Sequence, residues 1–323
     1  MGRNDTEHGN KKNYRGKKGK KAIKVILIIA AVFFVMNAIA TKIIYDMVFK
    51  RYDAVMNEKI AAKYEDFIAG RDVLSIPEGK EEIRAYFYDL DNEKGLVIIA
   101  PGLHAGADDL IPVAEGLYKG GYDILVFDPV GSVDSTGRSA KGFSREIFDL
   151  GAVMDYARTN LPGEDIYLLG HSRGTFAVCA RLAEDSDIKA AVSVSAHNSA
   201  MDAIISYSSR YVGPVANLNY PALWCYQALL FGPGTLGLKA DRLVNESTVP
   251  VLIAEGSEDD NAPPDKYSLY SKRNGITREN VFYYWGEEPG RNGHTDILFK
   301  EDEANQDLIE TVLVFFERAA NAQ

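Results

Sequence analysis

Short apolar runs of strand length alternate with helical patterns along most of this 323-residue chain, and this feature restricts its fold most strongly. The continuously apolar runs lie at 95–100, 123–127, 165–169, 190–194 and 250–254. Such runs are typical of parallel strands that helices cover on both faces. Helical patterns lie between or after them, at 110–117, 144–158, 174–183 and 307–319. The alternation predicts an α/β domain over 71–323, with an open, mostly parallel sheet flanked by helices.

The N-terminal part of the chain has the composition of a membrane anchor. Residues 1–21 carry an excess of Lys and Arg, and the segment 25–40 is apolar except for Asn37. With its flanks this segment, 22–44, is long enough to cross a bilayer as a helix. Because positively charged flanks stay in the cytoplasm, the residues after the helix are expected on the other side. We therefore predict a basic cytoplasmic tail, a transmembrane signal-anchor helix and an extracytoplasmic domain.

A cleaved signal peptide is the alternative interpretation of the same segment. Residues 38–40 (Ala-Ile-Ala) fit a small-residue cleavage site, and cleavage near Ala40 would release a secreted protein. Apolar residues at helical spacing nevertheless continue past that site, which favours an uncleaved anchor. Apolar residues at helical spacing, with charged residues between them, continue over 45–70. This segment is predicted to be a stalk or a packing helix.

The charge of the chain is distributed unevenly. The formal net charge is −10, so the part that follows the basic tail is strongly acidic. An acidic body argues against a nucleic-acid partner, which requires clustered Lys and Arg facing phosphates. The sequence offers no cluster of metal ligands, and its two cysteines, Cys179 and Cys225, do not make a disulfide framework. We therefore expect neither a nucleic-acid partner nor a metal.

The pentapeptide at 170–174 (GHSRG) carries the central chemical signal. It directly follows the run at 165–169 and opens the next helical pattern. A sharp turn from strand to helix needs small flanking residues, because the serine backbone is strained and its neighbours approach closely. Such a turn places the serine hydroxyl at the carboxyl ends of the strands, where open α/β sheets bind ligands. Ser172 is therefore predicted to be a nucleophile rather than an N-capping serine.

A serine nucleophile needs a base to remove its proton and an acid to orient that base. On this kind of turn the acid and then the histidine follow the serine along the chain. The acid is expected in the loop after the run at 250–254, where Asp259 is our choice and Asp260 and Glu258 stay alternatives. His294 is the predicted base, because it follows the last strand pattern and precedes the final helix.

The negative oxygen of an acyl-transfer intermediate needs two preorganised N–H donors. One is expected to be the backbone amide of Arg173, directly after the nucleophile. The other is expected from the loop after the run at 95–100, which reads PGLHAG over 101–106. Leu103 is the predicted donor there, because Gly102 lets the backbone turn inward.

A long stretch at about 197–249 interrupts the alternation of strands and helices. It lies between two predicted strands and is longer than a usual connection. Aromatic residues are frequent in it, including Tyr207, Tyr220, Trp224 and Phe231. We predict a helical cap with its own small core, which also shapes a substrate pocket as a lid.

From about Glu82 to its end the chain resembles an α/β-hydrolase of the serine esterase, lipase and aminopeptidase-like group. The segments that carry the resemblance are, in order, 101–103 (PGL), 128–137 (DPVGSVDSTG), 170–174, Asp259 and His294. Two positions depart from the pattern of the family. Pro101 stands where many relatives carry His, and Val133 stands where Gly is common.

The resemblance and the residues together predict a serine hydrolase that works through an acyl-enzyme and needs no cofactor. The aromatic cap favours a small-molecule substrate with an apolar or acyl group, so carboxylic ester hydrolysis is the leading prediction. A peptidase or amidase of the same fold would use the same residues. A non-catalytic, membrane-tethered binding protein on a hydrolase scaffold is the alternative from another class.

Overall fold

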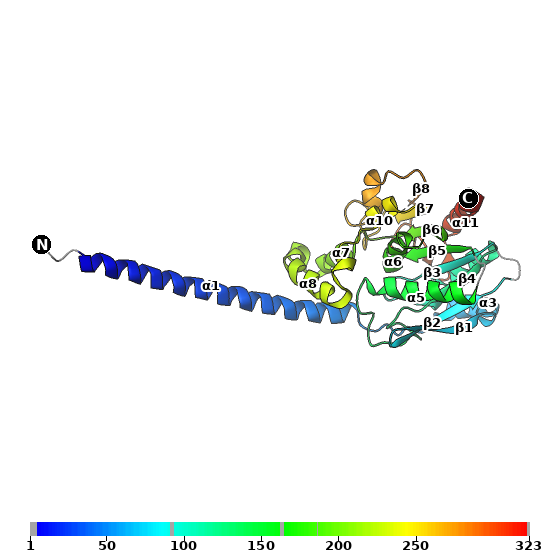
Figure 1. Cartoon of the computed structure of the whole chain (residues 1–323). Helices are drawn as coiled ribbons and strands as arrows, with labels where there is room; N and C mark the ends of the chain where they lie inside the picture. The colour runs from blue at the N-terminus through cyan, green and yellow to red at the C-terminus, as the bar shows by residue number, and fades with distance from the viewer. Residues whose placement is uncertain (1–4, 91–93, 162–164, 186, 322–323) are drawn as a thin grey trace.

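In the computed structural model a single mixed sheet forms the centre of the molecule, and one long helix projects from it (Figure 1). The structure describes residues 5–90, 94–161, 165–185 and 187–321. The strands of the sheet are β1 (Asp72–Glu78), β2 (Glu81–Tyr88), β3 (Leu96–Ala100), β4 (Asp123–Phe127), β5 (Ile166–His171), β6 (Ile188–Val194), β7 (Val251–Gly256) and β8 (Val281–Gly286). Their order in the sheet is β1-β2-β4-β3-β5-β6-β7-β8.

The sheet is parallel from β4 to β8, and only β1 and β2 run antiparallel to their neighbours. The predicted α/β fold with a mostly parallel open sheet is therefore confirmed. The sequence did not indicate β1, because this edge strand buries only Ile76 completely and contains Pro77. An edge strand tolerates proline and needs few apolar residues, so it carries no continuous apolar run.

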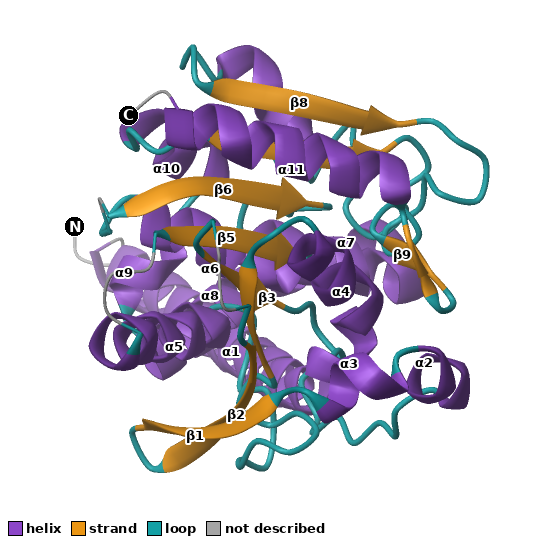
Figure 2. Ribbon diagram, turned by 90° about the vertical axis from the view of Figure 1, so that its right-hand side faces the viewer, coloured by secondary structure: helices purple, strands orange, loops and turns teal. Residues whose placement is uncertain are grey.

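Helices cover both faces of the sheet (Figure 2). The helices α4 (Ile111–Lys119) and α11 (Gln306–Asn321) lie on one face, and α5 (Arg145–Asn160), α6 (Arg173–Leu182) and α10 (Ala240–Glu246) lie on the other. Side chains along each strand alternate between two cores. In β3, Leu96 and Ile98 pack on the α5–α6 side, and Val97 and Ile99 pack on the α4–α11 side. Burial on both faces is why the central strands are apolar at every position.

The helix α1 (Asp5–Val48) extends away from the sheet (Figure 1). By length and composition Lys20–Val48 is, among the described residues, the one helical segment that is apolar enough to cross a membrane, with a mean hydropathy of 2.6 over its most apolar 18-residue window. The most apolar window of this segment is not buried in the protein. The predicted apolar helix is present, and its orientation across a membrane stays a prediction. The helix also includes most of the predicted tail, of which residues 1–4 lie outside the described part.

Residues 45–70 do not form the continuous stalk or packing helix that their spacing predicted. After α1 the chain forms no regular element until α2 (Glu58–Lys63), which the side chain of Asn57 caps, and α3 (Glu65–Ala69) follows. The interruption has a physical reason. Phe49 is buried in the core, and isolated β-bridges at Lys50 and Tyr52 join the chain to the loop between β4 and α5. Packing against the main domain therefore replaces helical hydrogen bonds in this segment.

The stretch predicted as a cap is helical. It contains α7 (Ala200–Val212), the 3-10 helix η2 (Gly213–Asn219), α8 (Tyr220–Phe231), α9 (Pro233–Leu236) and α10. The first elements lie beside the end of α1 (Figure 1), whereas α10 packs on α6 and belongs to the layer that covers the sheet. We therefore use the word cap for α7, η2, α8 and α9. The remaining short elements are η1 (Ala107–Leu110), η3 (Tyr270–Gly275), β9 (Phe299–Lys300) and β10 (Glu303–Ala304).

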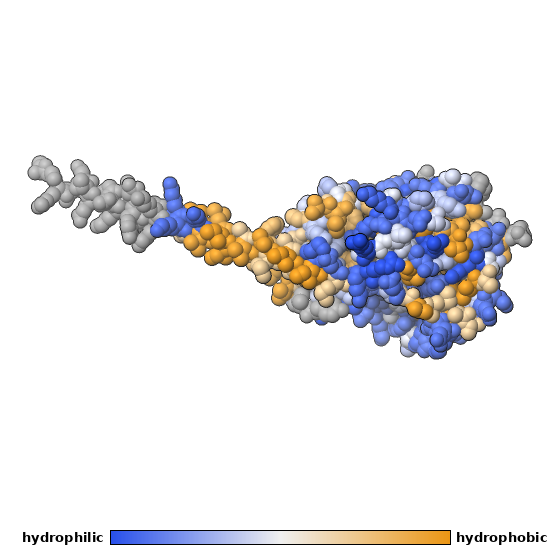
Figure 3. Space-filling model, turned by 90° about the horizontal axis from the view of Figure 1, so that it is seen from below, coloured by the Kyte–Doolittle hydropathy of each residue, from blue (hydrophilic) through white to orange (hydrophobic). Residues whose placement is uncertain are grey.

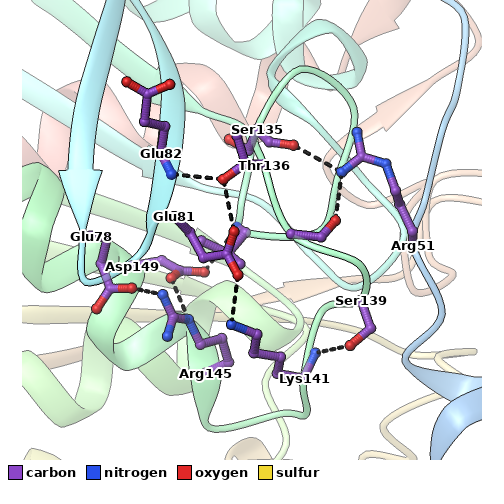
Figure 4. Close-up of polar contacts among 12 residues, drawn as sticks. Arg51, Glu78, Glu81, Glu82, Ser135, Thr136, Ser139, Lys141, Arg145 and Asp149 are labelled. Atoms are coloured by element: carbon purple, nitrogen blue, oxygen red, sulfur yellow. Dashed lines mark hydrogen bonds and ion pairs between the residues drawn. The ribbon is translucent and has the colours of Figure 1, made fainter.

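Arg51 also ties the segment after α1 to the main domain (Figure 4). Its guanidinium donates hydrogen bonds to three backbone carbonyls of one loop, those of Val133, Ser135 and Gly137. The same loop is tied to β2, because Lys141 pairs with Glu81 at 3.0 Å (Figure 4). The loop between β4 and α5 is thus held from two sides.

Arg51→Ala would leave these carbonyls without their charged donor. We expect a decrease of about 2 kcal/mol in the free energy of unfolding, because a hydrogen bond to a charged group contributes more than a neutral one. Urea unfolding of the full chain in detergent micelles, followed by tryptophan fluorescence, measures this change. The control is Arg242→Ala, since Arg242 is exposed and pairs with Glu246 on its own helix. Equal effects of the two substitutions would contradict the role of Arg51.

Candidate active site

Ser172 lies at the turn between β5 and α6, where close packing imposes the local sequence. Its φ is 53°, a left-handed conformation that is strained for a residue other than glycine. A Cβ atom on Gly170 would lie 2.6 Å from the backbone of Thr175, and one on Gly174 would lie 2.1 Å from the carbonyl oxygen of Ala100. Both flanking positions therefore require glycine, and the turn holds the serine at the carboxyl end of β5.

The structure brings the predicted serine, histidine and aspartate together from three loops. The Nε2 atom of His294 lies 2.8 Å from the Oγ atom of Ser172. The Nδ1 atom of the same ring lies 2.7 Å from the Oδ2 atom of Asp259. Asp259 follows β7 and His294 follows β8, so neighbouring parallel strands deliver both groups to one edge of the sheet. This is the geometry that proton transfer from a serine hydroxyl to an oriented imidazole requires.

The alternative acids do not reach the histidine. The side chain of Asp260 is 83% exposed and forms an ion pair with Arg210 at 3.3 Å. Glu258 is exposed on the same loop. Of the three carboxylates, Asp259 alone is buried and directed at His294.

The surroundings of Asp259 keep its carboxylate ionised. Burial opposes ionisation, but the hydrogen bond and charge of His294 hold the pKa of Asp259 below its usual range. Two backbone amides, those of Asn261 and Ala262, also donate to its Oδ1 atom at 2.8 Å. Burial, together with the nearby charge of Asp259, raises the pKa of the neighbouring Glu255 well above its usual range.

Two further histidines that the sequence did not single out pack around His294. The Nε2 atom of His171 donates to the backbone carbonyl of His294 at 3.0 Å, and that of His197 donates to the carbonyl of Asn261 at 2.9 Å. Burial, together with the nearby His294, lowers the pKa of each to about 4. Both rings are therefore neutral near pH 7 and hold the loops of the triad in place. Among the described residues, no group of three or more His, Cys, Asp or Glu could hold a metal ion.

The two predicted oxyanion donors lie on either side of the serine. Arg173 is the first residue of α6, where backbone amides have no intrahelical acceptor. Its side chain is buried and pairs with Glu146 of α5 at 2.5 Å, so it anchors the turn to α5. Leu103 lines the same cavity as Ser172, and a Cβ atom on the adjacent Gly102 would lie 3.3 Å from the serine Cβ. The loop after β3 therefore lies directly against Ser172.

A cavity of about 360 Å³ opens above Ser172. Its apolar wall comes from α1, the loop before α5, the cap and β9, and includes Val48, Phe49, Phe143, Ile204, Tyr207 and Phe299. The sequence did not predict that the end of α1 contributes to this wall. The apolar spacing that continues through Val48 was the available signal, but nothing in that pattern indicated which surface it would cover. The position of the cap over the cavity agrees with its predicted role as a lid.

The fold and the site together define the class of this protein. A family model described as the alpha/beta hydrolase fold matches residues 95–213, which include the turn at Ser172 and the first helix of the cap. The chain has the α/β-hydrolase fold, and the predicted resemblance to this superfamily is confirmed.

Solved structures of low sequence identity share this fold. An esterase of Pyrococcus furiosus has a TM-score of 0.63 at 19% identity, covering 84% of this chain and 98% of its own. A putative lipase of Acinetobacter baumannii has a TM-score of 0.57 at 17% identity, covering 84% and 98%. A protein of Butyrivibrio proteoclasticus bound to ferulic acid has a TM-score of 0.55 at 21% identity, covering 77% and 100%. No curated protein matches the sequence.

The buried histidines make the stability of the protein depend on pH. The pKa of His197 is about 4 when folded and about 6.5 when unfolded, so between these values the unfolded chain binds more protons. The free energy of unfolding therefore falls as the pH falls through this range. We expect His197→Asn, which does not titrate, to lose about 2 kcal/mol less than wild type between pH 7 and pH 5. Urea unfolding at the two pH values measures this difference, and parallel losses would contradict it.

Proposed function

We propose that this protein is a serine hydrolase that cleaves carboxylic esters through an acyl-enzyme, with Ser172, His294 and Asp259 as its catalytic triad. The observation that carries the proposal is the continuous hydrogen-bonded chain from the serine hydroxyl to the buried aspartate. Two hydrogen bonds of 2.8 Å and 2.7 Å orient the imidazole so that one ring nitrogen accepts the serine proton while the other stays bound to the carboxylate.

In the proposed mechanism the Oγ atom of Ser172 attacks the ester carbonyl and its proton moves to Nε2 of His294. The negative oxygen of the tetrahedral intermediate is bound by the backbone amides of Leu103 and Arg173. The C–O bond to the alcohol then breaks, and the alcohol leaves with the proton from His294. A water molecule gives a proton to the same nitrogen and attacks the acyl carbonyl. The bond from the acyl carbon to Oγ of Ser172 then breaks, His294 returns its proton to Oγ, and the acyl group departs as a carboxylic acid.

The lining of the cavity favours an ester over a peptide with a free amino terminus. A site that grips a cationic amine needs carboxylates directed into it. Asp109 is the one carboxylate among the described residues that line the cavity, and its Oδ2 atom already accepts from the amide of Gly106 at 2.9 Å. The other lining residues are aromatic, aliphatic, uncharged polar or histidine. The similarity to an esterase and a putative lipase supports the same substrate class.

We further propose that α1 is an uncleaved signal anchor, with a basic cytoplasmic tail at 1–21, a membrane span at 22–44 and the hydrolase domain on the extracytoplasmic side. The excess of positive charge before the span supports this orientation. The absence of a helix break before Ala40 supports an intact anchor, because α1 continues through this site to Val48. Detection of residues 1–21 in the mature membrane protein would exclude the secreted alternative.

Hydrolysis of p-nitrophenyl butyrate by three variants tests the triad. We expect Ser172→Ala to lower kcat/KM by about 10⁴-fold or more, and Asp259→Asn by about 10³-fold to 10⁴-fold, because the amide cannot stabilise the imidazolium. Asp260→Asn is the matched control, since this carboxylate is exposed and paired with Arg210. It should change the rate less than about twofold.

Wild-type activity that survives Ser172→Ala would contradict the proposed nucleophile. A larger loss of activity in Asp260→Asn than in Asp259→Asn would show that Asp260 is the acid and that our choice of Asp259 is wrong. A folded wild-type protein that hydrolyses no ester, while it binds a ligand in the cavity, would favour the non-catalytic binding protein.

A further inference from the structure

The cap is attached to the membrane-spanning helix itself. The Oγ1 atom of Thr41 in α1 donates to the Oδ1 atom of Asn219 in η2 at 2.9 Å. One turn further along α1, the ring of Tyr45 meets the ring of Tyr226 in α8, with their centroids 4.9 Å apart. Thr41 and Tyr45 are buried by these contacts, although most of α1 is exposed. The contacts determine how far along α1 the cap reaches.

This attachment places part of the cap at the depth of the bilayer. If the span ends near residue 44, Asn37 lies about 10 Å below that end, because a helix rises about 1.5 Å per residue. Phe33 and Asn37 line one groove together with Val215 and Leu218 of η2. The η2 segment therefore lies beside the outer part of a span whose hydrocarbon region is about 30 Å thick.

The surface of the cap carries exposed apolar side chains, as a surface inside the bilayer requires. Large apolar side chains on η2 and α8 are exposed: Val215, Leu218, Tyr220, Trp224, Leu229 and Leu230. Leu218 is 65% exposed and Leu229 is 82% exposed. Figure 3 shows that the apolar surface of α1 continues onto the end of the folded domain that α1 joins. An apolar patch of this extent on a soluble surface is unfavourable, and burial in lipid removes it from water.

The groove between α1 and the cap borders the cavity above Ser172. It has a volume of about 260 Å³, and none of the described residues that line it is charged. Val48, Phe49 and Ile204 line both this groove and the cavity above Ser172. The two spaces thus share a wall. The groove lies at the depth of the lipid, and the cavity lies above Ser172.

We propose that the cap is seated in the outer leaflet of the membrane and that the groove receives the acyl chain of a membrane lipid ester, whose carbonyl then reaches Ser172. The continuity of the exposed cap surface with the membrane span identifies a lipid as the occupant, because both surfaces lie at the same depth. The substrate class rests on the proposed ester hydrolysis, whereas the seating of the cap does not.

Tryptophan quenching tests the seating of the cap. The chain has two tryptophans, Trp224 on α8 and Trp285 on β8, with similar exposures of 42% and 37%. The full chain is reconstituted into phosphatidylcholine vesicles with brominated acyl chains, which quench tryptophan on contact. We expect strong quenching in Trp285→Phe, where Trp224 remains, and little in the matched variant Trp224→Phe. Equal quenching of both variants, or none of Trp224, would overturn the proposal.

Obstruction of the groove tests the path of the acyl chain. Ala40 lines the groove, whereas Ala38 is exposed on α1 away from it. The measured quantity is the ratio of two rates, hydrolysis of p-nitrophenyl palmitate within vesicles and of p-nitrophenyl acetate in water. We expect Ala40→Trp to lower this ratio about tenfold, and Ala38→Trp to change it less than about twofold.

The outcomes separate this inference from the proposed function. If the wild type cleaves the acetate but not the vesicle-bound palmitate, or if Ala40→Trp leaves the ratio unchanged, the lipid path is wrong and ester hydrolysis stands. If the wild type cleaves neither ester, the proposed function fails and the lipid substrate fails with it. Quenching of Trp224 would still establish that the cap lies in the membrane.

Discussion

The close packing of the turn between β5 and α6 against the neighbouring strands determines the geometry at the carboxyl edge of the sheet, where Ser172 lies. Gly174 approaches the carbonyl oxygen of Ala100 in β3 so closely that no side chain fits between them. On the other side, the amide of Ser172 donates to the carbonyl of Val194 in β6 at 2.9 Å. The turn between β5 and α6 is thus held by the strands on both sides, and their packing compensates the strained conformation of the serine. Because β7 and β8 run parallel to β6, the loops that carry Asp259 and His294 emerge at the same edge.

The apolar helix α1 and the α/β domain form one structural unit. Tyr45 and Phe49 at the end of α1 belong to the same core cluster as residues of β3, α5 and α6. Val48 and Phe49 also form part of the cavity wall above the nucleophile. A helix that only tethered the domain would not need these contacts. The proposed position of the membrane and the shape of the cavity above Ser172 are therefore linked through the last turn of α1.

The sequence predicted the central fold, and it singled out the three residues, Ser172, Asp259 and His294, that the structure brings together. The reasons are physical. Strands covered on both faces must be apolar throughout, and a strained turn needs glycine on either side, so both features are visible as local patterns. Edge strand β1 was not predicted, because it buries only Ile76 completely and therefore carries no continuous apolar run. The choice among the neighbouring carboxylates depended on burial of Asp259 and exposure of Asp260, which no local pattern encodes. The packing of α1 against the cap likewise depends on tertiary contacts.

The most direct test of the account is the site of covalent modification by a fluorophosphonate. The full chain in detergent is treated with the reagent and digested, and mass spectrometry locates the adduct. We expect one adduct, on Ser172, which disappears in His294→Ala because the hydroxyl then lacks its base. An unmodified Ser172 in the folded wild type, or equal modification in His294→Ala, would contradict the central claim that this serine is an activated nucleophile.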